Sequence, residues 1–275
     1  MIKSKIEWCD STWNPVVGCY HECQYCYARR IANRLKGCDD SPDGSTGERI
    51  VHLEERLKAT TKGGVIHNAA YPFGFTPTLH EYRLEDPFKK GFGETVFVCS
   101  MADLFGAWVP DEWIEKVFTA CKAAEGHRYL FLTKNPARYI ELAQAGKLPA
   151  GDSFWYGSTA TSPEMPVFYA GGYNTFVSVE PLLTRFGVPI AAPSADWAII
   201  GAETGNRKDK VTPEREWVEE IVGAFHAAGK PVFMKDSLIP VVGESGMIRE
   251  FPWGEETAGN GGWADHFHNR FERMV

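Results

Sequence analysis

The chain has 275 residues, of which 44% are hydrophobic and 24% are charged, and its formal net charge is −7. This composition is ordinary for a globular protein and excludes a disordered or collagen-like chain. The acidic balance argues against a strong nonspecific polyanion binder, although a local basic groove is compatible with a nucleic-acid substrate. No apolar run approaches the ~18 residues of a membrane helix, and the N-terminus lacks a secretory signal, so we expect a cytoplasmic protein with no membrane partner.

The first part of the chain contains a cysteine-rich segment, which is followed by a helical pattern. Apolar residues recur at helical spacing from Tyr27 onward, and Gly37 is a plausible stop. Residues 37–94 are rich in Gly and Pro turn signals, so we interpret them as an irregular insertion. Within this insertion, residues 47–58 have the pattern of a short amphipathic helix.

From residue 95 onward, short apolar runs alternate with amphipathic helical patterns. The runs cover residues 95–100, 128–134, 154–159, 175–180, 196–203 and 231–236. The helical patterns cover residues 110–124, 136–145 and 213–228. Buried parallel strands are continuous apolar runs, and their alternation with helices predicts βαβ units. We therefore expect one α/β domain over residues 1–275, a partial (β/α) barrel of about six parallel strands with a C-terminal extension at 240–275.

Polar side chains at the ends of these runs are the first candidates for a site. In barrels of this kind, chemistry takes place on the loops at the carboxyl ends of the strands. The charged candidates for catalysis are Lys134, Glu180, Glu203 and Lys235, because charges in apolar surroundings are rare unless they are paired or functional. The alternative is that internal Lys–Glu pairs brace the mouth of the barrel, and both interpretations stay open.

Three of the seven cysteines, Cys19, Cys23 and Cys26, lie within eight consecutive residues. Soft thiolates on one tight loop suit an iron–sulfur cluster or zinc. Because no second close pair of cysteines follows, the Cys-x3-Cys-x2-Cys spacing favours a [4Fe–4S] cluster with one open iron. The alternative is a closed zinc site, in which His21, a distant histidine or Cys9 supplies the fourth ligand.

The three-cysteine segment, with Tyr25 before its last cysteine, resembles the signature of the radical S-adenosylmethionine superfamily. The resemblance implies a full or partial barrel with the cluster loop after the first strand, and an electron donor of the flavodoxin or ferredoxin type. It also implies that S-adenosylmethionine binds the open iron and is cleaved to a 5′-deoxyadenosyl radical, which abstracts a hydrogen atom from a substrate.

The superfamily resemblance also suggests which residues contact S-adenosylmethionine. Tyr25 would lie against the adenine, and Ser158 and Thr159 are candidate partners of the ribose hydroxyls. Many members have a Gly-Gly-Glu segment after the second strand, which holds the methionine amino group. This chain has Ser100-Met101-Ala102-Asp103 there, so Ser100 and Asp103 are the candidates for that contact.

A narrower resemblance extends from residue 13 to about residue 236. It rests on the short blocks Trp13-Asn14-Pro15, Ser100–Phe105, Leu132–Pro136, Glu180–Leu183 and Gly201–Gly205. These blocks are similar to those of phage-associated three-cysteine-motif proteins, which implies a neighbouring partner protein. The candidate substrates are a nucleobase or nucleic acid, reached by base flipping or in single strands, and a peptide of the partner protein. The competing hypothesis is a non-enzymatic, zinc-stapled binding module.

Overall fold

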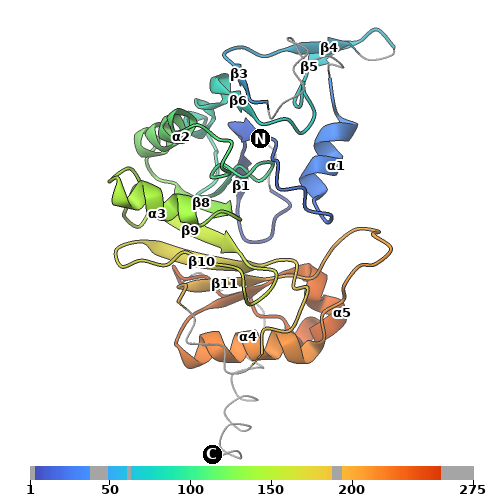
Figure 1. The fold of residues 1–275 in the computed structure, drawn as a ribbon, viewed down its shortest axis with the longest axis vertical. Coiled ribbons are helices and arrows are strands. Elements are labelled where there is room, and N and C mark those ends of the chain that lie inside the picture. Colours follow the sequence, from blue (N-terminus) through green and yellow to red (C-terminus); the bar gives the residue numbers. More distant parts are fainter. Residues whose placement is uncertain (1–3, 38–48, 61–62, 188–193, 255–275) are drawn as a thin grey trace, which may run out of the picture. The chain divides into compact units, whose positions relative to one another are not determined.

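The computed structural model describes residues 4–37, 49–60, 63–187 and 194–254. Seven strands form one sheet in the order β1-β7-β8-β9-β10-β11-β12, which follows the order of these strands along the chain (Figure 1). The pairs β1–β7, β7–β8, β10–β11 and β11–β12 are parallel. A sequential order of parallel strands with intervening helices is the topology of a partial (β/α) barrel, so the predicted fold class is confirmed, with seven strands.

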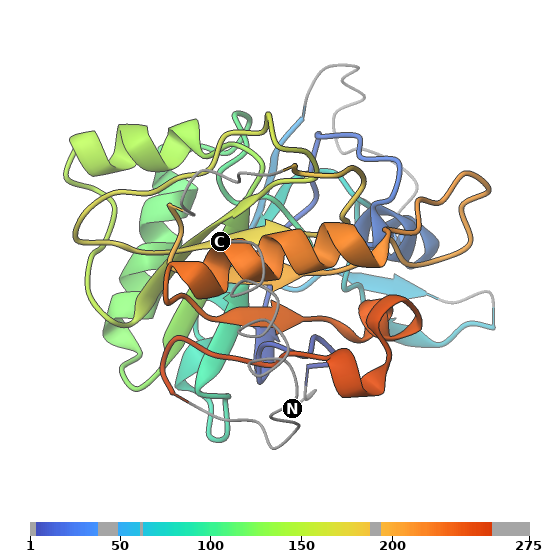
Figure 2. The same cartoon turned by 90° about the horizontal axis from the view of Figure 1, so that it is seen from below.

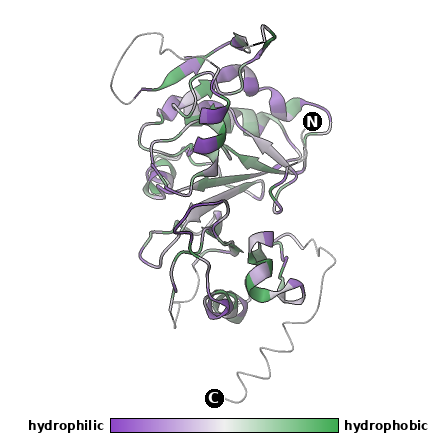
Figure 3. Cartoon of the chain, turned by 90° about the vertical axis from the view of Figure 1, so that its right-hand side faces the viewer, coloured by the Kyte–Doolittle hydropathy of each residue, from purple (hydrophilic) through white to green (hydrophobic). Residues whose placement is uncertain are grey.

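The strands are short and mostly buried, as parallel strands are when both faces are covered. They are β1 (Ser11–Trp13), β7 (Thr95–Val98), β8 (Arg128–Thr133), β9 (Phe154–Thr159), β10 (Asn174–Val179), β11 (Trp197–Ile200) and β12 (Val232–Met234). Every residue of β7, β9 and β11 is buried. Figure 3 shows much of the sheet in green, the colour of hydrophobic residues. The six apolar runs therefore predicted six strands correctly, whereas β1 is too short to give such a run.

The four main helices lie where the helical patterns predicted them. They are α1 (Tyr27–Arg34), α2 (Asp111–Ala123), α3 (Ala137–Gln144) and α4 (Arg215–Ala227). In α2 the buried residues include Trp113, Val117, Phe118 and Cys121, which recur at helical spacing. The first turn of α2 carries Asp111 and Glu112, which interact favourably with the positive end of the helix dipole.

The insertion is more regular than its turn signals predicted. It contains β6 (Thr78–His80), which pairs on one side with β3 (Val51–Leu53) and on the other with β2 (Val16–Val17), a strand that precedes the insertion. It also contains a separate ribbon of β4 (Lys58–Thr60) and β5 (Ile66–Asn68). Two 3-10 turns, Glu81–Arg83 and Asp86–Phe88, lead back to β7. The predicted helix over residues 47–58 is wrong over its described part, because Val51–Leu53 pair with β6 as a strand.

The chain divides into two compact units, residues 1–156 and residues 157–275. The core of the first unit is aromatic: Phe105 lies 4.5 Å from Tyr139 and 5.9 Å from Phe131 between ring centroids. In the second unit, helix α4 crosses β11 and β12, and it buries Val218, Ile221, Val222 and Phe225 there (Figure 2).

The C-terminal extension begins with α5 (Ile239–Val242) and then returns along β12 through a bridge between Phe233 and Arg249. The part of the extension from residue 255 onward lies outside the described residues. Within the described ranges, no helix combines the length and apolar character that crossing a bilayer requires.

Candidate functional site

The three clustered cysteines lie on one loop, residues 18–26, which we call the cysteine loop. Its first residue, Gly18, forms a parallel bridge with Ala102, so the loop begins beyond the carboxyl ends of β1 and β7. Gly18 has a φ of +89°, and a Cβ atom there would lie 2.4 Å from the carbonyl carbon of Thr76. Only glycine fits this position without displacement of the backbone.

Backbone N–H groups point at two of the three sulfur atoms. Cys26 is the N-cap of α1, and its Sγ accepts a hydrogen bond from the backbone N–H of Arg29 at 3.3 Å. Cys19 Sγ accepts from the backbone N–H of His21 at 3.5 Å. Such donors, and the N-terminus of a helix, stabilise the thiolate form that binds a metal. The loop is closed by a hydrogen bond from the N–H of Cys26 to the carbonyl of Cys23 at 3.1 Å.

The three thiols lie near one another, because Cys23 and Cys26 both contribute to the pKa of Cys19. Among the described residues, no group of three or more His, Cys, Asp or Glu side chains is arranged to hold a metal ion. Cys23 Sγ instead points toward the carbonyl of His21 at 4.0 Å. Burial raises the pKa of the Cys19 thiol to about 12, so this thiol is neutral on its own. A metal that binds here must displace the proton, as metals do when they coordinate a thiol.

The side chain of Arg29 places a positive charge under the cysteine loop. Its Nη2 donates to the carbonyl of Cys19 at 3.4 Å, and its guanidinium carbon lies 5.5 Å from the ring centroid of Phe75. Within the described part of the chain, the buried Nε of Arg29 has no hydrogen-bond partner. A half-buried cation with an unused, buried donor beside three thiols fits an anionic group, such as an iron–sulfur cluster held by thiolates.

Asp103 ties the cysteine loop to the end of β8. Its Oδ2 accepts from His21 Nε2 at 2.7 Å and from the N–H of Lys134 at 2.9 Å, and its Oδ1 accepts from Thr133 Oγ1 at 2.7 Å and the N–H of Phe105 at 3.0 Å. Burial alone would raise the pKa of Asp103, but these hydrogen bonds outweigh it and hold the pKa below its ordinary value. Asp103 is therefore a buried carboxylate, and both of its oxygens accept hydrogen bonds from donors of the protein itself.

Tyr25, Lys134 and Ser100 lie near the same loop. Lys134 Nζ is 5.8 Å from the ring centroid of Tyr25, which is within the range of a cation–π contact. Ser100 Oγ donates to Asn14 Oδ1 at 3.1 Å, and the carbonyl of Ser100 accepts from the hydroxyl of Tyr27 at 2.8 Å. The structure thus brings five of the predicted site elements together in the first unit: the cysteine loop with Tyr25, Ser100, Asp103 and Lys134.

The remaining cysteines have other surroundings. Cys9 precedes β1, at the amino end of that strand, and its Sγ donates to Ser4 Oγ at 3.3 Å. The cysteine loop follows the carboxyl end, so Cys9 lies on the side of β1 away from it. Cys99 and Cys121 are buried in the core, and Cys38 lies outside the described residues.

The other predicted residues belong to the second unit. Ser158 and Thr159 are buried at the end of β9, and Ser158 Oγ accepts from the N–H of Phe168 at 2.9 Å. Glu180 and Lys235 form an ion pair with each other. Gly201 lies beside this pair, and a Cβ atom there would crowd both side chains.

Glu203 is held by Arg207, whose Nε and Nη2 donate to its two oxygens at 2.7 and 2.8 Å. The hydrogen bonds from Arg207 are the main reason why the pKa of Glu203 lies below its ordinary value.

A family profile described as "Protein of unknown function (DUF5131)" matches residues 3–238. The chain belongs to the DUF5131 family. Comparisons with curated proteins and with solved structures gave no match.

Several residues that shape the cysteine loop of this DUF5131 protein were not among the predicted site residues. They are Asn14, Arg29, Thr133 and Trp108. Trp108 lies edge-on against His21 at 4.9 Å between ring centroids and folds over Gly106, where a Cβ would lie 2.3 Å from its ring. Asn14 and Thr133 belong to the Trp13-Asn14-Pro15 and Leu132–Pro136 blocks, so the resemblance in those blocks could have indicated them. No motif in the sequence indicated Arg29 or Trp108.

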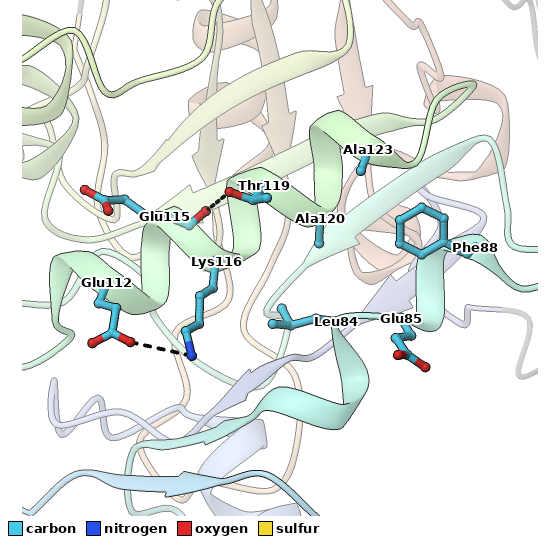
Figure 4. Close-up of a pocket in the computed structure, with 9 residues that line it drawn as sticks. All are labelled: Leu84, Glu85, Phe88, Glu112, Glu115, Lys116, Thr119, Ala120 and Ala123. Carbon is cyan, nitrogen blue, oxygen red and sulfur yellow. Dashed lines mark hydrogen bonds and ion pairs between the residues drawn. The ribbon is translucent and has the colours of Figure 1, made fainter.

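The DUF5131 chain also has a shallow groove of about 510 Å³ between α2 and the 84–88 segment (Figure 4). Its walls include Leu84, Phe88 and Ala120, with Lys116 at one end. None of the lining residues belongs to the cysteine loop or to its contacts, so the groove is separate from the candidate site.

Proposed function

We propose that this DUF5131 protein is a radical S-adenosylmethionine enzyme in which Cys19, Cys23 and Cys26 hold a [4Fe–4S] cluster. When bound, the cluster and S-adenosylmethionine at its open iron would supply one-electron cleavage of the sulfonium and abstraction of a hydrogen atom from a substrate. The observation that carries the proposal is the cysteine loop itself: three thiols on nine residues beyond the ends of β1 and β7, with N–H donors on two sulfurs.

The chain's own residues have distinct tasks in this proposal. Arg29 offsets the negative charge of the thiolates from below the loop, and its buried Nε supplies a donor that the protein itself leaves unused. Asp103 fixes the loop through His21 and keeps it in register with the end of β8. Because both oxygens of Asp103 are engaged, we assign it to positioning rather than to the methionine amino group.

Tyr25 and Lys134 form the polar rim of the site. The aromatic face of Tyr25 is suited to packing against an adenine, and the ammonium of Lys134 is suited to a carboxylate or phosphate. Ser100 offers a hydroxyl at the end of β7 and is held by Asn14. Ser158 and Thr159 remain the proposed ribose partners, and Glu180, Glu203 and Lys235 remain the proposed substrate-handling groups of the second unit.

The test is anaerobic reconstitution of the full chain with iron and sulfide, followed by quantification of both and by electron paramagnetic resonance after reduction. We expect iron and sulfide near four each per chain and release of 5′-deoxyadenosine from S-adenosylmethionine under reducing conditions. Cys23→Ala should lose the cluster, whereas the matched variant Cys9→Ala should keep it. A colourless chain with one bound zinc would overturn the proposal in favour of a zinc-stapled binding module, as would a cluster that survives Cys23→Ala.

A further inference from the structure

Helix α1 has an exposed basic face that starts at the cysteine loop. Between Cys23 and Gly37 the sequence contains Arg29, Arg30, Arg34 and Lys36, and no acidic residue. Apart from Arg29, these basic side chains are exposed, and so are Tyr27 (45%) and Leu35 (51%) beside them. We call the exposed set, Tyr27, Arg30, Arg34, Leu35 and Lys36, the α1 patch.

The charges of the α1 patch are not all explained by the stability of the helix. Arg34 lies in the last turn of α1, where a cation interacts favourably with the helix dipole, but Arg30 lies toward the positive end, where a cation is unfavourable. Arg30 and Arg34 are four positions apart and therefore lie on the same face, where like charges repel by about 0.2–0.5 kcal/mol. No carboxylate of the described residues forms an ion pair with Arg30 or Arg34. An exposed charge at Arg30 that costs the helix stability indicates a role outside the helix.

An apolar surface adjoins the α1 patch. The end of α1 packs on the β4–β5 ribbon, because a Cβ on Gly37 would lie 2.8 Å from the Cβ of Ala69 and 3.1 Å from that of Ala59. The ribbon exposes Val65 (64%) and Ile66 (66%), and Figure 1 shows it beside the far end of α1. Of the eight large apolar side chains that are exposed in the described ranges, five fall between residues 27 and 66. Exposed apolar side chains on segments that pack together are typical of an interaction surface.

We propose that the α1 patch, with Val65 and Ile66, docks an acidic electron-carrier protein; this inference rests on the proposed function. The first argument is charge complementarity. On a chain of net charge −7, a local cluster of exposed arginines, which pairs with no carboxylate of the described ranges, gives an acidic partner a favourable place of approach. Exposed aliphatic side chains beside the charges are suited to a protein surface, whereas single-stranded nucleic acids stack on aromatic rings.

The second argument is proximity to the thiols. Cys26 caps α1, so Arg30 and Arg34 lie one and two turns along the helix, about 6 Å and 12 Å from Cys26 along the axis. A carrier that docks on this helix is therefore close to the cluster site. One electron leaves the reduced carrier and reaches the cluster, so the carrier is oxidised by one electron, the cluster is reduced by one, and no bond is made or broken. Small, polar interfaces are typical of such transient redox encounters.

The test uses flavodoxin, an acidic flavoprotein, as the probe and the full chain as the receptor. The Kd is measured by calorimetry with the metal-free chain at low salt, and the rate of cluster reduction is measured anaerobically with the reconstituted chain. For Arg30→Glu/Arg34→Glu we expect the Kd to rise about tenfold or more and reduction by flavodoxin to slow in parallel. Arg30→Gln/Arg34→Gln should give an intermediate effect, and Val65→Ser/Ile66→Ser should weaken binding without changing its dependence on salt.

Lys89→Glu/Lys90→Glu, which changes the net charge equally at another exposed position, is the matched control and should bind flavodoxin as the wild type does. Reduction by dithionite, which needs no docking, should be the same in all variants. Equal flavodoxin affinity of the wild type and Arg30→Glu/Arg34→Glu would overturn the docking proposal, as would binding of an oligonucleotide to the patch with none of flavodoxin. Failure of dithionite to reveal any cluster would instead overturn the proposed function, while the metal-free binding measurement would still test the patch.

Discussion

Asp103 accepts a hydrogen bond from His21 Nε2 at 2.7 Å, although the two residues are 82 positions apart in the chain. The contact joins the cysteine loop to the segment that follows β7. Since the pKa of Asp103 lies below its ordinary value, the carboxylate is ionised and His21 Nε2 must carry the proton in this bond. The geometry of the cysteine loop is therefore set partly by a residue outside it.

Asp103→Asn should destabilise the chain by about 3 kcal/mol, because the amide NH2 would face an N–H donor that then has no acceptor. Thr133→Ser is the matched control, since it keeps the hydroxyl donor to Asp103 and should cost about 1 kcal/mol for the lost methyl. Urea unfolding of the metal-free chain gives both free energies of unfolding. Hydrogen exchange of residues 19–26 should also be faster in Asp103→Asn. Equal stability of the two variants would contradict the assigned role of the carboxylate.

Gly18→Ala should destabilise the chain much more than Gly126→Ala. Both glycines have similar positive φ angles, +89° and +85°, so both variants carry the same backbone strain of about 1–2 kcal/mol. Only at Gly18 does the added Cβ also meet a backbone carbonyl, at 2.4 Å, whereas nothing lies within 4 Å of it at Gly126. Thermal unfolding of the two variants measures the difference. Similar melting temperatures would mean that the cysteine loop is not packed against Thr76 as described.

The strands and helices from residue 95 onward could be predicted from the order of their hydrophobic residues. These residues form continuous runs in the buried strands and recur at helical spacing in the helices. The run 154–159 predicted β9 to the residue, and the pattern with Trp113, Val117 and Phe118 predicted α2 within one residue at each end. The insertion could not be predicted in this way. Its strands are three residues long, and β5 is exposed throughout, so no hydrophobic period is present to detect them.

The grouping of the three cysteines could be predicted from the sequence, but the residues that support their loop could not. The spacing of Cys19, Cys23 and Cys26 is local, and it is readable from the chain. The bond from His21 to Asp103 depends on how the loops after β1 and β7 meet, which is a property of the fold rather than of either segment. For Glu180 and Lys235, the alternative of an internal Lys–Glu pair is what the structure contains, and the pair gives no evidence for or against catalysis.

His80 should make the chain less stable as the pH falls below about 6.5. Burial lowers the pKa of His80 to about 3, and Arg83 adds to the effect. Between these two pH values the unfolded chain binds a proton that the folded chain does not, so the free energy of unfolding falls with decreasing pH, by about 2 kcal/mol at pH 5.

His80→Leu should remove this contribution, so its free energy of unfolding should depend less on pH between 7 and 5 than that of the wild type. Urea unfolding at several pH values gives the two slopes. His67→Gln, which removes an exposed histidine, is the control and should retain the slope of the wild type. A slope for His80→Leu equal to that of the wild type would show that His80 titrates in the folded chain as it does in the unfolded chain.

Arg207→Ala should destabilise the second unit at pH 7, because it leaves the buried Glu203 carboxylate without its ion-pair partner. The double variant Glu203→Leu/Arg207→Met should recover most of this loss, since a buried ion pair and an apolar pair of similar volume have comparable stability.

The effect of Arg207→Ala should also depend on pH in a defined direction. In the wild type, Arg207 holds the pKa of Glu203 below its ordinary value near 4.5, so the pair contributes stability above that pH and loses it as the pH falls through the lower, folded pKa. Acidification neutralises the Glu203 carboxyl, and a neutral carboxyl no longer depends on the charge of Arg207. The difference in the free energy of unfolding between wild type and Arg207→Ala should therefore shrink from pH 7 to pH 4. A difference that is constant over this range would mean that Arg207 acts through packing rather than through the charge of Glu203.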